Sequence, residues 1–187
     1  MLTETLNLPG LLHSLRERLA GALAGLPEHT GLVSVTLAMP ELNGLRFSAT
    51  DEMAVYWARP GEQQYLATSG TAVRLTACGG DRFLHLEQKF QHHLKSWLQQ
   101  DPEKVGGGAR AFLGFAFEAR CGDRQSASAE LFVPTVLLEQ DGSTSRFVFT
   151  CYRPSSGPTV DAVPDWLRCA QYLLRAFELK PEPSAPA

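Results

Sequence analysis

The stretch Val55-Tyr56-Trp57-Ala58-Arg59-Pro60-Gly61-Glu62 joins an aromatic run to a turn sequence. Aromatic and β-branched side chains favour extended strands. A proline followed directly by a glycine is typical of a type II turn, since proline fixes φ at the second position and glycine tolerates a positive φ at the third. The stretch therefore predicts a hairpin, with strands over residues 53–58 and 64–68.

Further strands are predicted on both sides of this hairpin. Alternating or β-branched runs occur at residues 32–39, 72–76, 111–117, 131–139 and 146–152. The last two segments flank Gln140-Asp141-Gly142, so they form a second hairpin. Pro134 cannot donate a backbone hydrogen bond, and its strand therefore begins late, bulges or lies at a sheet edge.

Three helices are predicted, over residues 9–26, 81–100 and 163–179, because apolar residues recur there at spacings of three and four. In the second helix these residues are Phe83, Leu86, Phe90, Leu94 and Trp97. Hairpins between flanking helices indicate an α+β fold with a mainly antiparallel sheet. We expect one domain over residues 1–179 and a Pro-rich linker or tail over residues 180–187.

Composition excludes several classes of partner. The chain has 187 residues, a formal net charge of −3 and no run of Lys or Arg, so we expect no nucleic-acid binding. It has no apolar run of about 18–20 residues, which argues against a membrane span. The first residues do not resemble a secretory signal, and we expect a cytoplasmic protein with Cys78, Cys121, Cys151 and Cys169 as reduced thiols.

The sequence offers only weak candidates for catalytic and ligand-binding residues. His85 and His92 lie seven residues apart, about 10 Å along a helix, while His92 and His93 point about 100° apart, so a metal site is not expected. Gly106-Gly107-Gly108 lacks the Lys-Ser/Thr of a phosphate-binding loop and is interpreted as a flexible turn.

The remaining candidates have structural interpretations too. They are Glu52 and Glu118 at strand ends, the four cysteines, the isolated histidines His13 and His29, and the strand aromatics Tyr56, Trp57, Phe112, Phe115 and Phe117. Carboxylates at strand ends are solvated by default, and cysteines in apolar surroundings are usually inert. Without interleaved basic residues, aromatic strands more often face a core than a nucleic-acid base.

Taken in order, these motifs resemble the N-terminal half of isochorismate synthases, in the chorismate-utilising enzyme family. The resemblance rests on Tyr56-Trp57-Ala58-Arg59-Pro60-Gly61-Glu62, on Leu113-Gly114-Phe115-Ala116-Phe117-Glu118 and on the apolar strand with Val133-Pro134. It covers roughly residues 8–180 and departs from the family where Glu118-Ala119 replaces the usual Asp-Pro. It makes Tyr56, Trp57 and Arg59 core and turn residues of a scaffold.

The resemblance implies that the catalytic lysine, the acid glutamate and the Mg²⁺-binding glutamates belong to a C-terminal half. Lys104-Val105 does not match the Lys-Val-Val-Leu-Ala-Arg-like strand of that half, so no catalytic, cofactor-binding or metal residue is assigned in this chain. The sequence thus predicts a non-catalytic scaffold domain whose partner is the catalytic half or, through an exposed apolar face, a second copy. The whole enzyme would convert chorismate to isochorismate for siderophore, salicylate or menaquinone synthesis.

Two alternatives remain open from sequence. The chain could be a stand-alone binding or regulatory module for chorismate-pathway compounds, although Leu137-Leu138-Glu139-Gln140 only partly resembles the Leu-Leu-Glu-Ser effector motif of related enzymes and lies elsewhere in the chain. It could also be an independent enzyme that uses a cysteine nucleophile, which would require a nearby base.

Overall fold

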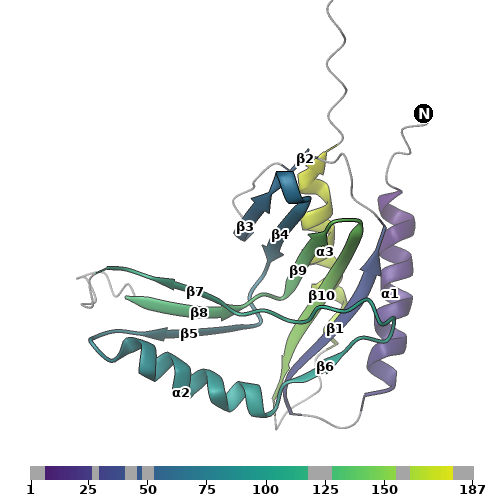
Figure 1. Ribbon diagram of the computed structural model, residues 1–187. Helices are drawn as coiled ribbons and strands as arrows, with labels where there is room; N and C mark the ends of the chain where they lie inside the picture. Colours follow the sequence, from purple (N-terminus) through teal and green to yellow (C-terminus); the bar gives the residue numbers. More distant parts are fainter. Residues whose placement is uncertain are drawn as a thin grey trace, which may run out of the picture.

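The computed structural model describes residues 7–26, 30–40, 46–47, 53–117, 128–154 and 161–178 (Figure 1). These residues form the helices α1 (Leu8–Ala24), α2 (Arg82–Lys95) and α3 (Val163–Ala176), a short 3-10 helix η1 (Pro60–Glu62), and eleven strands. All strand pairs are antiparallel except one, which confirms the predicted α+β fold. Among the described residues, no helix is long and apolar enough to cross a membrane.

The larger sheet has six strands in the order β3-β4-β9-β10-β1-β6. Its strands are β1 (Gly31–Met39), β3 (Met53–Arg59), β4 (Gln64–Ser69), β6 (Leu98–Gln100), β9 (Val136–Asp141) and β10 (Thr144–Arg153). Strand β1 pairs with β10 along its whole length, from Gly31 opposite Arg153 to Met39 opposite Ser145. The two predicted hairpins, β3–β4 and β9–β10, are therefore both present and lie in one sheet.

A second sheet of three strands follows the order β5-β8-β7. It contains β5 (Val73–Ala77), β7 (Phe112–Phe115) and β8 (Ala129–Val133), and α2 packs beside it (Figure 1). The two-residue strands β2 (Arg46–Phe47) and β11 (Phe177–Glu178) form a separate pair. The β4–β9 ladder continues into the β5–β8 ladder across a bend, where the Ala72 N–H donates to the Val133 oxygen at 2.8 Å.

The strand predicted over 131–139 is thus two strands in two different sheets. Residues 134–135 interrupt it, because Pro134 has no N–H to donate and lies between β8 and β9. The prediction that Pro134 disturbs its strand is confirmed, but a single continuous strand is wrong.

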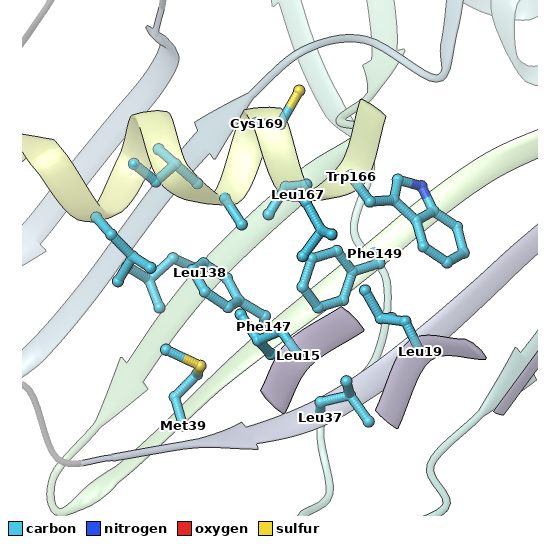
Figure 2. Packing of buried hydrophobic residues seen from close by; sticks show 14 of the residues in the cluster. Leu15, Leu19, Leu37, Met39, Leu138, Phe147, Phe149, Trp166, Leu167 and Cys169 are labelled. Atoms are coloured by element: carbon cyan, nitrogen blue, oxygen red, sulfur yellow. The ribbon is translucent and has the colours of Figure 1, made fainter. Parts of the chain in front are cut away.

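Helices α1 and α3 cover the same face of the six-stranded sheet and enclose the core. Figure 2 shows Leu15 and Leu19 of α1, Trp166 of α3, and Phe147 and Phe149 of β10 within this core. All five side chains are fully buried. Burial of each such side chain contributes about 1.5–3 kcal/mol, so this layer stabilises the sheet from one side.

One predicted boundary and one predicted turn type are wrong. Helix α2 ends at Lys95, and residues 98–100 form β6, parallel to β1. The Trp97 indole N–H donates to Ser34 Oγ at 2.8 Å, which attaches the chain to β1 and ends the helical path. The turn after β3 is the 3-10 helix η1, and its left-handed residue is Gln63, with φ 52°, instead of Gly61.

The aromatic residues of the outer strands are exposed, contrary to the core assignment. Tyr56 and Trp57 are 39% and 40% exposed, and Phe115 and Phe117 are 60% and 100% exposed. Strands β3 and β7 are each at the edge of a sheet, so neighbours cover them on fewer sides. Phe112 is the exception, because it stacks on Phe132 with ring centroids 5.4 Å apart.

Candidate functional site

A cluster of buried charged side chains lies on the sheet face opposite α1 and α3, around Glu139. Glu139 of β9 and Arg146 of β10 stand directly opposite each other in the ladder, and Arg146 Nε donates to Glu139 Oε2 at 2.8 Å. Their side chains are 7% and 11% exposed. A hydrogen-bonded ion pair of this kind joins the two strands of the hairpin in a poorly solvated place.

A second arginine reaches the same carboxylate from the segment 101–111, which connects β6 to β7. Arg110 Nη2 donates to Glu139 Oε1. Gly107 has φ +81°, and a Cβ there would lie 2.4 Å from Arg146 Nε, so only glycine allows this close approach. Figure 1 shows the 101–111 segment crossing β10 and β1 on its way to β7. Glu139 therefore fixes this segment to the sheet.

The first part of the 101–111 segment is held by two further carboxylates. Asp101 accepts the N–H groups of Val105 and Gly106, at 3.0 and 2.8 Å. Glu103 accepts hydrogen bonds from Arg18 Nε of α1 at 2.6 Å and from the Ala38 N–H of β1 at 2.7 Å. The hydrogen bond from Arg18 lowers the pKa of Glu103, although partial burial opposes the shift. One carboxylate thus connects α1, β1 and the 101–111 segment.

A buried hydroxyl pair lies beside this cluster on the same sheet. Ser34 Oγ and Thr150 Oγ1 are 2.8 Å apart, on residues that face each other across β1 and β10. Trp97 and Trp166 donate their indole N–H groups to Ser34 Oγ and to the Thr150 carbonyl, respectively. The hydrogen-bond partners of both hydroxyls among the described residues are a hydroxyl and an indole N–H, so these contacts join the strands and the helix ends.

The described residues do not fit a Mg²⁺ site. Magnesium requires several oxygen ligands, chiefly carboxylates and waters. Among the described residues, no group of three or more His, Cys, Asp or Glu side chains could hold a metal ion. Glu139, which is the only buried carboxylate in the described part of the chain, has both oxygens bound by guanidinium groups. Glu139 therefore stabilises the fold and has no free oxygen to offer a metal ion.

The histidines lie apart from this cluster. His85 lines a cavity of about 350 Å³ with Ala77, Cys78, Gln88 and Lys89. His92 and His93 have ring centroids 5.9 Å apart, and His93 makes an edge contact with Tyr152. Desolvation, and then the neighbouring His92, lowers the pKa of His93. His13 Nε2 lies 3.4 Å from Glu17 Oε1 on the exposed side of α1, whereas His29, Glu52 and Glu118 lie outside the described residues.

The cysteines differ from the prediction of four reduced thiols. Cys78, directly after β5, is disulfide-bonded, whereas Cys151 and Cys169 are free. Spacing along the sequence could not reveal this bond, because only folding brings distant thiols together. Burial raises the pKa of the Cys151 thiol, which makes it a poor nucleophile at neutral pH. Cys169 is 3% exposed, and Cys121 lies outside the described residues.

The Glu139 cluster was missed in the sequence, although one signal was present. Glu139 and Arg146 flank the predicted turn Gln140-Asp141-Gly142 at positions that a short hairpin pairs across strands. Opposite charges at such positions are a recognisable cross-strand pair. The contribution of Arg110 had no local signal, because it arrives from 29 residues away.

Comparison with known proteins places the chain in a family. The sequence matches the family described as chorismate binding enzyme over residues 19–184. Among solved structures, the fold is similar to MenF, the menaquinone-specific isochorismate synthase from Escherichia coli, with 19% sequence identity and a TM-score of 0.49.

That similarity covers 92% of this chain and 35% of the other, so the chain spans about a third of the length of the solved structure. No curated protein matches the sequence. Because the family match extends over most of the 187 residues, the chain belongs to the chorismate binding enzyme family.

Proposed function

We propose that this chain is a non-catalytic scaffold domain of an isochorismate synthase-like enzyme and acts together with a catalytic polypeptide segment. The observation that carries the proposal is the hydrogen bonding of Glu139. The buried carboxylate on the sheet face opposite α1 and α3 binds two arginines, so it positions the 101–111 segment and is not free to transfer a proton. Membership of the chorismate binding enzyme family supports the wider context.

The complete enzyme would convert chorismate to isochorismate with Mg²⁺ bound by its catalytic segment, for siderophore, salicylate or menaquinone synthesis. This domain would supply a rigid sheet against which that segment folds. Its partner would be the catalytic segment, or a second copy through the exposed apolar side chains. We place it in the cytoplasm.

The direct test is turnover by the isolated chain. The purified protein is incubated with chorismate and Mg²⁺, and isochorismate is measured by liquid chromatography. We expect no product above the rate without protein. Enzymatic formation of isochorismate by the isolated chain would overturn the proposal.

The second candidate is a regulatory module that binds compounds of the chorismate pathway. It is favoured by an open hollow of about 440 Å³ between α1 and α3, which is lined by both basic and apolar side chains. The lining residues are Pro9, Leu12, His13, Arg16, Pro164, Leu167, Arg168 and Gln171. Calorimetric titration with chorismate and aromatic amino acids separates the candidates, because a scaffold binds none of them. An Arg16→Gln substitution should weaken any binding in the hollow.

A further inference from the structure

Arg82, the first residue of α2, is a buried cation that has no counter-ion among the described residues. Its exposure is 8%, and none of the ion pairs formed by the described residues includes it. Its Nη1 and Nη2 donate to the carbonyl oxygens of Gly79 and Ala116, at 3.2 and 3.4 Å, and its buried Nε has no partner. A guanidinium carries five N–H donors, so two long bonds to neutral acceptors leave it unsatisfied.

The helix end at which Arg82 lies adds positive charge. The first N–H groups of a helix have no partner within the helix and carry part of its dipole. The side chain of Asp81, at the cap position of α2, makes no capping hydrogen bond, and the first turn contains no acidic residue. Asp81 is exposed and forms no ion pair with Arg82. The unpaired guanidinium and the uncapped helix end therefore both favour an anion here.

Apolar rings surround this positive charge on the outside. The guanidinium carbon of Arg82 lies 4.6 Å from the centroid of the Phe83 ring, and Phe83 meets Phe115 edge to face at 5.4 Å. Phe83 and Phe115 are nevertheless 42% and 60% exposed. Exposed apolar neighbours on α2 and around the edge strand β7 are Leu84, Leu113 and Phe117. Concentrated apolar exposure of this kind marks an interaction surface.

We propose that the surface formed by Arg82, Phe83 and Phe115 docks a segment of a partner polypeptide in which one carboxylate is flanked by apolar side chains. The carboxylate accepts hydrogen bonds from the Arg82 guanidinium and the first N–H groups of α2. The flanking side chains cover Phe83 and Phe115. A polypeptide segment suits this surface because its apolar side chains extend along both a helix and a strand edge. That the partner is the catalytic segment rests on the proposed function, whereas the surface itself does not.

The test uses benzoate as a probe, since it combines a carboxylate with a ring. Thermal unfolding of the whole chain is followed in benzoate, in acetate and in benzyl alcohol, at equal ionic strength. The variants are Arg82→Met, which replaces the guanidinium with an apolar side chain, and Arg59→Met, which removes an exposed arginine at the end of β3 in the other sheet. At a benzoate concentration about ten times its Kd, we expect a rise in melting temperature of about 3–6 °C for the wild type and Arg59→Met.

Arg82→Met should show no such rise. Acetate and benzyl alcohol should raise the melting temperature of the wild type less than benzoate does. Equal effects of benzoate on the wild type and Arg82→Met, or no effect on either, would overturn the proposal. If Arg82→Met does not fold, the site is tested in the wild type by nuclear magnetic resonance. Benzoate should then change the chemical shifts of the Phe83 and Leu84 N–H groups, and unchanged shifts would refute the site. These results do not depend on turnover, so they can fail separately from the proposed function.

The identity of the occupant is tested by sedimentation. If Phe115→Glu converts a dimer of the chain into a monomer, while Trp57→Glu on the other sheet does not, the occupant is a second copy and the proposed partner is wrong. A chain that is monomeric with and without Phe115→Glu supports a different polypeptide as the occupant.

Discussion

Gly70 and Thr135 hold the bend at which the smaller sheet leaves the larger one. The Thr135 N–H donates to the Gly70 oxygen at 3.3 Å, and Gly70 has φ +69°. A methyl group at Gly70 would lie 2.7 Å from Thr135 Oγ1 and 3.0 Å from Cys169 Sγ of α3. The backbone of this bend is therefore in contact with both a strand end and a helix, and only glycine fits between them.

Replacing Gly70 should destabilise the fold by two separate effects. In Gly70→Ala, a left-handed residue acquires a Cβ, which costs about 1 kcal/mol, and the close contacts add about 1–3 kcal/mol. Urea unfolding measures the total. Gly79→Ala is the matched control, because Gly79 has φ +89° but open space around its Cβ position. Equal losses in the two variants would contradict the role of the contact with Thr135.

Removal of the buried carboxylate should be costly. Glu139→Ala leaves Arg146 almost buried without its partner, so we expect the free energy of unfolding to fall by about 3–5 kcal/mol. Glu130→Ala is the control, because its ion pair with Arg74 is exposed and is worth at most about 1 kcal/mol. A loss below that of the control would show that the cluster does not stabilise the sheet. Replacing Glu139 and Arg146 together by leucine should cost less than Glu139→Ala alone.

The link through Glu103 should weaken in acid. Its pKa in the folded protein is lowered from the ordinary value of 4.5, first by the hydrogen bond from Arg18, against the opposing effect of burial. A lowered folded pKa means that the unfolded chain binds the proton more readily. The stabilisation is therefore complete above pH 4.5 and is lost as the pH falls through the folded pKa.

This dependence is measured as the difference in unfolding free energy between the wild type and Glu103→Gln across pH 2.5 to 7, a range of about two units on each side of the ordinary carboxyl pKa. The difference should shrink toward the acid end. A difference that is constant with pH would refute the role of the charged form. Glu62→Gln, which breaks an exposed ion pair with Arg59, is the control and should change the unfolding free energy at pH 7 by at most about 1 kcal/mol.

The rate and number of reacting thiols should reveal both the disulfide and the burial of the free cysteines. In the folded protein, Cys151 and Cys169 should react slowly with a disulfide reagent, because burial raises the pKa of Cys151 and Cys169 is 3% exposed. After unfolding without reductant, fewer than the four thiols of the sequence should react, and all four should react after reduction. One fast cysteine in the folded state would instead favour a nucleophilic enzyme.

Part of the candidate site could have been predicted from the sequence. The opposite charges of Glu139 and Arg146 flank a recognisable turn, and hairpin register brings them together. Arg82 could not have been identified in this way. Its burial results from α2 packing against the three-stranded sheet, where the guanidinium reaches the Ala116 carbonyl just after β7. A buried cation with no counter-ion among the described residues has no signature in local sequence.

Local sequence determined most of the elements of this protein. Leucines at helical spacing and Pro9 in the first turn produce α1, and the turn at Gly142 produces the β9–β10 hairpin, because these signals act between residues close in the chain. Tertiary structure alone decided where elements end and which aromatics are covered. Trp97 leaves the helix because Ser34 accepts its indole N–H, and Tyr56, Trp57 and Phe115 are exposed because their strands lie at sheet edges. Edge position depends on which strands pair across the whole chain, and hydrophobic patterning does not encode that order.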